Sequence, residues 1–210
     1  YSTMLIKITE DNRKEILRKA IEILKDGGIV AYPTETFYGL GVKFDNEHSL
    51  GKLYELKKRP EEKPVPLIIG NRESLSMIAA SVNETAESLM DKFWPGPLTL
   101  LLKAKKGLSP YLTANTGSIA VRIPGESAAL YLVREAGFPI TATSANPSGM
   151  PPAEDADAVI RYFGEKIDMV IDGGRTAGGL PSTIVDAAGE SIKIVREGVI
   201  ARSVFEKPRS

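Results

Sequence analysis

The stretch Ile29-Val30-Ala31-Tyr32 and the nine residues after it, Pro33-Thr34-Glu35-Thr36-Phe37-Tyr38-Gly39-Leu40-Gly41, set the pattern on which the fold depends. The apolar run lies between two turn signals, which predicts a buried strand. The proline and the glycines predict a tight loop over residues 33–41, in which several side chains can form hydrogen bonds. Because α/β sheets bind ligands where their strands end, this loop is a candidate site. The alternative is a capped turn with Tyr38 packed in the core.

Short apolar runs and helical periodicities alternate irregularly along the rest of the chain. The strands that this pattern predicts cover residues 5–8, 29–32, 65–69, 98–103, 118–123, 138–143, 169–171, 183–185 and 192–195. The predicted helices cover residues 11–25, 49–57, 72–80, 84–93, 128–135 and 153–163. Some strands follow one another too closely for the crossovers that parallel strands need. We therefore predict an α/β fold, or α+β in stricter schemes, with a mixed sheet covered by helices.

The composition is that of a single globular domain spanning residues 1–210. The 27 basic residues equal the 27 acidic residues in number. Proteins that coat nucleic acid carry a basic excess, so zero net charge favours a small-molecule protein. No apolar run approaches the about 20 residues of a membrane span, and no signal peptide is visible, so we expect a cytoplasmic protein without a membrane. Met4 is expected to be the natural start, with residues 1–3 as an added remnant.

The residue types that are rare or missing limit the catalytic mechanisms that are open to this protein. The chain has no cysteine and a single histidine, His48, which lies in the acidic stretch 45–48 and is expected at the surface or at a helix cap. Thiol nucleophiles, Ser-His-Asp and Cys-His catalysis and most zinc sites are therefore excluded. Catalysis must then rest on positioning, cations and a metal-bound phosphate.

Each of the further polar segments has two interpretations, one structural and one functional. Lys57-Lys58-Arg59-Pro60-Glu61-Glu62-Lys63-Pro64 is a solvated helix end or a stiffened phosphate site. Thr141-Ala142-Thr143-Ser144-Ala145-Asn146-Pro147-Ser148-Gly149 is an ordinary turn or a cradle for a nucleotide. Arg122 and Arg196, in or beside apolar strands, are edge residues or inward-facing anion ligands. The glycine-rich residues 172–183 lack a P-loop ending and form a mobile lid or a long hairpin.

Taken in order, seven motifs resemble those of the YrdC-like threonylcarbamoyl-AMP synthases. They are Pro33-Thr34-Glu35-Thr36, Tyr38-Gly39-Leu40-Gly41, Lys57 with Arg59-Pro60, Trp94-Pro95-Gly96-Pro97-Leu98-Thr99, Ala120-Val121-Arg122-Ile123-Pro124, Ser144-Ala145-Asn146 with Ser148-Gly149, and Pro181-Ser182-Thr183. The pairs Lys57/Arg59 and Ser144/Asn146 match the hallmark of that family. The similarity covers residues 5–199.

This resemblance implies a twisted mixed sheet around a concave, locally basic cleft, in the short form of the family without a further C-terminal domain. It also implies that L-threonine, bicarbonate or CO₂, and ATP react to threonylcarbamoyl-AMP and pyrophosphate. Mg²⁺ would accompany the ATP, with no metal held by protein side chains. The proteins of the tRNA threonylcarbamoyl-transfer machinery would use the product, so they are expected partners, with weak direct tRNA binding.

The resemblance also implies roles for single residues. Those expected at threonine are Thr34, Tyr38, Arg122 and Ser182, with the arginine pairing with the carboxylate. Those expected at the nucleotide are Lys57, Arg59, Lys63, Ser118, Ser144, Asn146 and Arg196. Lys57 and Arg59 would face the phosphates as the catalytic residues.

One departure and two alternatives remain. Long family members often carry a histidine after the strand that matches residues 65–69, where this chain has Gly70, so that contact is absent or replaced. The chain is otherwise compatible with a YrdC-like module that binds RNA. It is also compatible with a paralogue that acts on another amino acid or carbamoyl donor.

Overall fold

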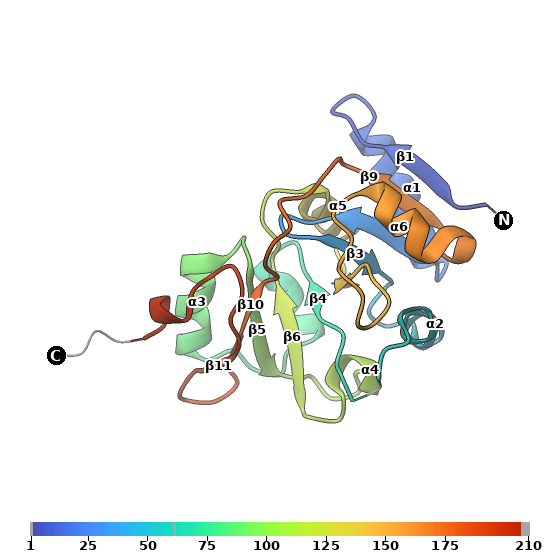
Figure 1. Cartoon of the computed structure of the whole chain (residues 1–210). Coiled ribbons are helices and arrows are strands. Elements are labelled where there is room, and N and C mark those ends of the chain that lie inside the picture. Colours follow the sequence, from blue (N-terminus) through green and yellow to red (C-terminus); the bar gives the residue numbers. More distant parts are fainter. Residues whose placement is uncertain (1, 61, 207–210) are drawn as a thin grey trace.

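The computed structural model describes residues 2–60 and 62–206, which form two mixed β-sheets flanked by helices (Figure 1). The predicted α/β class is therefore confirmed, but the one sheet of the prediction is divided into two. Tyr1, in the expected N-terminal remnant, and Glu61, in the cationic segment, lie outside the described residues. Apart from the changes given below, each predicted helix and strand has a counterpart.

The first sheet has the strand order β1 (Met4–Lys7), β9 (Met169–Asp172), β2 (Val30–Pro33), β3 (Tyr38–Gly41) and β8 (Thr143–Ser144). Strand β9 is parallel to β1 and β2, whereas β3 is antiparallel to β2 and β8. Helices α1 (Arg13–Lys25) and α5 (Ala128–Ala136) share a core with Val30 and Tyr32, while α6 (Ala156–Phe163) shares the other core with Ala31. Because successive side chains of a strand point to opposite faces, β2 is buried on both, which explains its unbroken apolar run.

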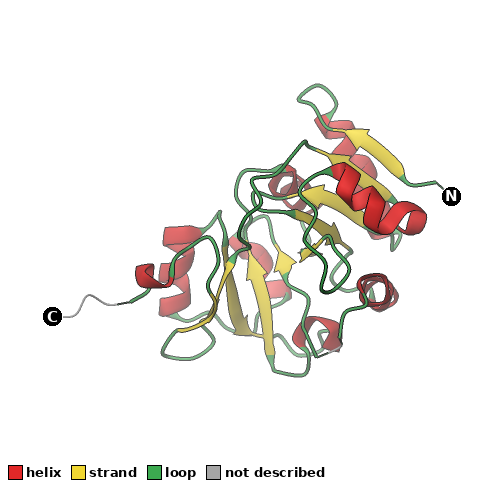
Figure 2. Ribbon diagram, in the orientation of Figure 1, coloured by secondary structure: helices red, strands yellow, loops and turns green. Residues whose placement is uncertain are grey.

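The second sheet has the order β11 (Lys193–Arg196), β10 (Thr183–Asp186), β5 (Leu98–Lys103), β6 (Ser118–Arg122), β4 (Leu67–Ile68) and β7 (Ile140–Thr141). The pairs β10–β5 and β4–β6 are parallel, and the other pairs are antiparallel. Helices α2 (Glu47–Lys57) and α3 (Glu84–Phe93) bury apolar residues in the core that β5 also lines, and α4 (Pro110–Thr113) lies against β6 (Figure 2). Short 3₁₀ helices span Arg72–Met77, Gly164–Lys166 and Arg202–Val204.

Residues 38–41 form strand β3, so the prediction of a loop throughout residues 33–41 is wrong for its second half. Gly39 and Gly41, which suggested a turn, instead leave room for the ring of Tyr32. A Cβ atom on Gly39 would lie 3.2 Å from the ring of Tyr32, and one on Gly41 would lie 2.7 Å from it. The glycines therefore let β3 pair with β2 beneath the tyrosine ring, and the turn is confined to residues 34–37.

The predicted strand 138–143 is two short strands, β7 and β8, which belong to different sheets. The chain changes sheet at Ala142, whose N–H donates to the carbonyl of Pro66 at 2.9 Å. The hydroxyl of Thr141 fixes this crossing, because it donates to Leu40 O at 3.0 Å and accepts from Val42 N at 2.9 Å. Local apolar character could not reveal a change of sheet, since both halves are buried.

Two further predictions change. Residues 72–77 form a 3₁₀ helix where an α-helix over 72–80 was expected, with the side chain of Asn71 accepting from Ser74 N. The glycine-rich residues 172–183 connect β9 of the first sheet with β10 of the second, so they are not a hairpin. Among the described residues, no helix is long and apolar enough to cross a membrane.

Candidate functional site

A cleft of about 700 Å³ is lined by residues of both sheets. The first sheet contributes β3 with the turn before it, and β8. The second contributes β4, β5, β6, β10 and β11. The lining includes hydroxyl side chains and the apolar side chains of Phe37, Leu101, Ile184 and Val195. The cleft therefore combines apolar surface with polar groups, as small-molecule sites do.

Four basic residues face this cleft, namely Arg59, Lys63, Arg122 and Arg196. No aspartate or glutamate lines it in the described part of the chain. The charges influence one another: partial burial, followed by the charges of Arg122 and Arg59, lowers the pKa of the Arg196 guanidinium. An arginine stays protonated at any ordinary pH, so the cleft holds an excess of positive charge that favours anionic ligands.

The end of α2 directs Arg59 into the cleft. Lys58 takes a left-handed conformation (φ 53°), which stops the helix, and Arg59 N donates to Tyr54 O at 3.0 Å. The Arg59 side chain then donates from Nε to Lys63 O at 3.1 Å and from Nη2 to Pro64 O at 2.7 Å. The guanidinium is thus held against its own loop while it lines the cleft.

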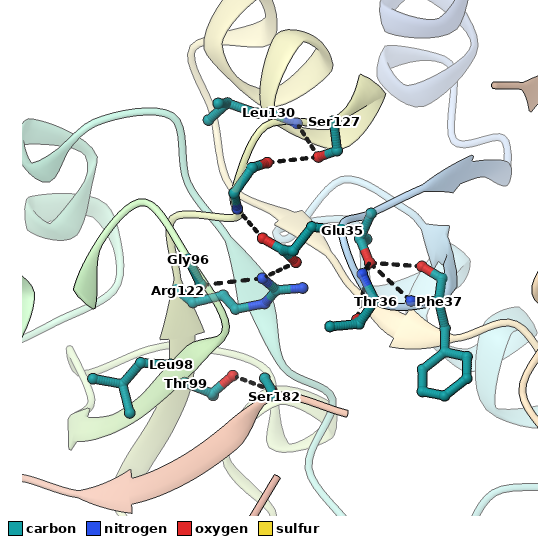
Figure 3. Close-up of polar contacts among 12 residues, drawn as sticks. Glu35, Thr36, Phe37, Gly96, Leu98, Thr99, Arg122, Ser127, Leu130 and Ser182 are labelled. Carbon is teal, nitrogen blue, oxygen red and sulfur yellow. Dashed lines mark hydrogen bonds and ion pairs between the residues drawn. The ribbon is translucent and has the colours of Figure 1, made fainter. Parts of the chain in front are cut away.

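Arg122, at the end of β6, is buried and pairs with Glu35 of the turn between β2 and β3 (Figure 3). Its Nη1 donates to Glu35 Oε1 and, at 3.2 Å, to the carbonyl of Gly96. The other oxygen of Glu35, Oε2, accepts from the N–H of Gly125. This ion pair connects the two sheets, because Glu35 follows a strand of the first and Arg122 ends a strand of the second.

Two other expected threonine ligands lie in the same cleft. Thr34 Oγ1 donates to Phe37 O at 2.6 Å and accepts from Thr36 N at 3.0 Å, which closes the turn between β2 and β3. Ser182 Oγ is 2.8 Å from Thr99 Oγ1 (Figure 3). In addition, Ser182 O accepts from Arg196 Nη2 at 2.8 Å. Both hydroxyls are mostly buried and fixed by neighbours.

The sequence left two interpretations of Tyr38, a core residue or a residue of the candidate site. The structure agrees with both, because Tyr38 is fully buried and also lines the cleft. Its hydroxyl donates to Gly174 O at 2.8 Å and accepts from Gly173 N at 3.1 Å. Burial is the main reason that the pKa of this phenol rises to about 12. Tyr38 is therefore a neutral group that ties the glycine-rich loop to β3.

Lys57 is not among the residues that line the cleft. It is 2% exposed, and its Nζ donates to Thr143 Oγ1 and to Ser144 O, both at 2.5 Å. Burial, and then the charge of Arg59, lowers the pKa of this amine to about 7. The side chain thus joins α2 to β8 from behind the cleft wall.

The remaining expected nucleotide ligands are placed unevenly. Ser144 lines the cleft and donates from Oγ to Asn146 Oδ1 at 2.6 Å. Asn146 is mostly buried, and its amide donates to Met150 O at 2.9 Å, which fixes the turn after β8. Ser118 lies outside the lining, two residues before Ala120 on the same face of β6. His48 is exposed on α2, as expected.

The sequence placed Glu35 among the hydrogen-bonding groups of the candidate loop, but it gave no role to Glu35 or to Thr99, although both lie in quoted motifs. Glu35 is a carboxylate at the end of a buried strand, and Thr99 is a hydroxyl within an apolar one. Both positions could have indicated a site residue, because a polar side chain in or beside a buried strand needs a hydrogen-bond partner. The partners, Arg122 and Ser182, lie 87 and 83 residues further along the chain.

The two sheets and the site define an α/β protein with a cation-lined cleft between two mixed sheets. A family model for Sua5/YciO/YrdC proteins, described as "Telomere recombination", matches residues 22–198. The chain belongs to this family, which confirms the resemblance found in its motifs.

Two relatives and one solved structure show how far the similarity extends. The threonylcarbamoyl-AMP synthase of Bacillus subtilis (strain 168) is 38% identical over 191 residues, 90% of this chain and 55% of the relative. That of Pyrococcus abyssi (strain GE5 / Orsay) is 36% identical over 98% of this chain and 60% of the relative. The crystal structure of P. abyssi Sua5 complexed with L-threonine superposes with a TM-score of 0.87, at 35% identity over 94% of this chain and 58% of that one. The chain thus spans little more than half the length of these relatives.

Proposed function

We propose that the protein is an L-threonylcarbamoyl-adenylate synthase, a nucleotidyltransferase that makes threonylcarbamoyl-AMP and pyrophosphate from L-threonine, bicarbonate or CO₂, and ATP. The main support is that basic side chains from three separate segments face one cleft, which no acidic residue lines in the described part of the chain. A triphosphate and an amino-acid carboxylate are both anions that such a cleft would bind. The name of the B. subtilis relative and the threonine in the P. abyssi structure support the same substrates.

The cleft suggests how its residues divide the two ligands. Arg122 would pair with the carboxylate of threonine, with Thr34 and Ser182 nearby and the ring of Tyr38 shaping the pocket. The residues that would hold the nucleotide and its phosphates are Arg59, Lys63, Ser144 and Arg196. Asn146 and Lys57 would act there through Ser144, to which both form hydrogen bonds. For Ser118 we propose a contact at the margin of the cleft.

The proposed chemistry needs no protein nucleophile. The threonine amine attacks the carbon of CO₂ and loses a proton, which gives a carbamate. A carbamate oxygen then attacks the α-phosphorus of ATP, and the bond to the β-phosphate breaks to release pyrophosphate. The arginines would hold the two anions together and stabilise the negative charge that builds on the phosphate oxygens. The scarcity of histidine and cysteine is compatible with this route.

We also propose that any Mg²⁺ arrives with ATP. Magnesium prefers carboxylate and phosphate oxygens. Among the described residues, no group of three or more His, Cys, Asp or Glu could hold a metal ion, and the cleft lining offers hydroxyls and cations instead. The donor set of the cleft therefore does not suit a protein-held magnesium, and the phosphates would have to supply the ligands.

The product would serve tRNA modification. We propose that partner proteins transfer the threonylcarbamoyl group to an adenosine of tRNA, and that direct tRNA binding by this chain is weak. Zero net charge supports weak binding, because tight contact with a phosphate backbone relies on a basic excess. The need for ATP supports action in the cytoplasm.

Pyrophosphate release is the direct test. The purified protein is given ATP with threonine, with bicarbonate, with both or with neither, in CO₂-depleted buffer. We expect pyrophosphate only when both are present, with threonylcarbamoyl-AMP as the second product. Turnover without bicarbonate, or none under any condition, would contradict the proposal.

The same assay separates the two alternatives. A module that binds RNA would show tight, salt-sensitive tRNA binding and no pyrophosphate release. A paralogue would release pyrophosphate with serine in place of threonine, or would use carbamoyl phosphate in place of bicarbonate.

A further inference from the structure

The segment Pro33-Thr34-Glu35 is a wall between two cavities. Thr34 lines both the cleft and a second cavity of about 620 Å³. Arg122 lines the cleft, whereas Glu35 lines the second cavity and is 20% exposed. The two partners of this ion pair therefore lie on opposite sides of the wall. The carboxylate contacts the arginine from the side away from the cleft.

The hydrogen bonds of the Arg122 side chain come from a single nitrogen of the guanidinium. Both of its hydrogen bonds, to Glu35 Oε1 and to Gly96 O, come from Nη1 (Figure 3). For Nε and Nη2 the described residues provide no hydrogen-bond partner. These two nitrogens form the edge with which arginine binds a carboxylate in a bidentate manner. The protein thus fixes one corner of the guanidinium and leaves the opposite edge available in the cleft.

Glu35 can give this support only as a carboxylate. Its two oxygens accept from different donors, Arg122 Nη1 and Gly125 N. A glutamine has one oxygen and would turn an NH₂ group toward one of these donors. Gly125 is also fitted to this role, since a Cβ atom there would lie 2.4 Å from Glu35 Oε2.

We infer that Glu35 is a positioning residue: it holds Nη1 of Arg122 so that the Nε–Nη2 edge is oriented for the carboxylate of the amino-acid substrate. This inference rests on the proposed function and names a group that determines affinity for one of the two substrates. Glu35 touches neither substrate in this view, and it acts through Arg122 alone. Glu35 forms no hydrogen bond with Arg59 or Arg196, the arginines that we place at the phosphates; its hydrogen bonds go to Arg122 and Gly125.

A pure charge effect has the opposite sign, which makes the inference testable. Removing a carboxylate next to an arginine raises the positive potential and would strengthen binding of an anion. If orientation matters more, the same change weakens threonine binding.

Isothermal titration calorimetry can measure L-threonine and ATP separately against wild type, Glu35→Gln and Gly125→Ala. Gly125→Ala displaces the carboxylate without altering it, so it serves if Glu35→Gln folds poorly. Glu126→Gln, an exposed neighbour that also lines the second cavity, is the matched control. We expect both test variants to bind threonine at least about tenfold more weakly, the effect of a lost charged hydrogen bond. ATP affinity should stay within about twofold, and the control should match wild type.

The outcomes separate this inference from the proposed function. If wild type fails to bind threonine, the proposed function is wrong. If wild type binds and Glu35→Gln binds equally or more tightly, the positioning role is wrong while the function stands. Equal losses for threonine and ATP, together with a lower melting temperature, would show that Glu35 merely stabilises the fold and would also overturn the inference.

Discussion

Replacing Lys57 with methionine should remove a pH dependence of stability that this buried amine gives to the folded protein. Its Nζ donates to Thr143 Oγ1 and Ser144 O, and an uncharged amine has the two hydrogens that these bonds need. Burial is the larger cause, and Arg59 the smaller, of the fall in its pKa from 10.5 to about 7. Methionine has a similar length and no titratable group.

The sign follows from proton binding. Between the folded pKa of about 7 and the ordinary pKa of 10.5, the unfolded chain holds a proton at Lys57 that the folded protein lacks. The free energy of unfolding therefore rises with pH across this window, by up to about 1.4 kcal/mol per pH unit. Between pH 8 and pH 9.5 this amounts to about 2 kcal/mol. The contribution is smallest below pH 7, where the folded protein must protonate the buried amine.

Urea unfolding followed by circular dichroism would measure this at several pH values between 8 and 9.5. Other groups titrate in both proteins, so the difference between wild type and Lys57→Met isolates the lysine. We expect wild type to gain about 2 kcal/mol relative to the variant over this range. Lys52→Met, at an exposed position of the same helix, should follow wild type. Parallel pH profiles for wild type and Lys57→Met would refute the reasoning.

Three other perturbations follow from the same contacts. Arg59→Ala should weaken ATP binding by about 1.5–3 kcal/mol, as for a lost charged hydrogen bond, in a calorimetric titration; an unchanged affinity would place the phosphate site elsewhere. Gly41→Ala should destabilise the protein by about 1–3 kcal/mol in urea unfolding, because the new Cβ meets the ring of Tyr32 at 2.7 Å. Gly189→Ala, where nothing lies within 4 Å, is its control, and equal effects would contradict the packing argument. Tyr38→Phe should speed hydrogen exchange in the glycine-rich loop between β9 and β10, since two hydrogen bonds to that loop are lost; unchanged exchange would mean that the tyrosine does not hold the loop.

The sequence was most informative where structure depends on near neighbours. Helix α1 follows from an apolar period, and β2 from a short apolar run, because both patterns act over a few residues. Strand β3 was missed because its glycines were interpreted by their local meaning as turn residues. Their actual role depends on the ring of Tyr32 across the hairpin.

For the site, the sequence by itself determined which chemistry was available and which family the motifs resemble. The lack of cysteine and the single histidine excluded most nucleophilic catalysis. The motifs also named 11 of the 24 residues that line the cleft, including Arg59, Arg122 and Ser182.

Only the tertiary structure decided where these side chains point and what holds them. The pairing of the sheets brings Glu35 to Arg122 across 87 residues, and it places Lys57 behind β8. Residue types and spacing cannot supply such contacts, because the direction of a side chain depends on which strands pair and on which face each side chain is buried. The sequence therefore named part of the site, and the arrangement of the two sheets decided its remaining members and its geometry.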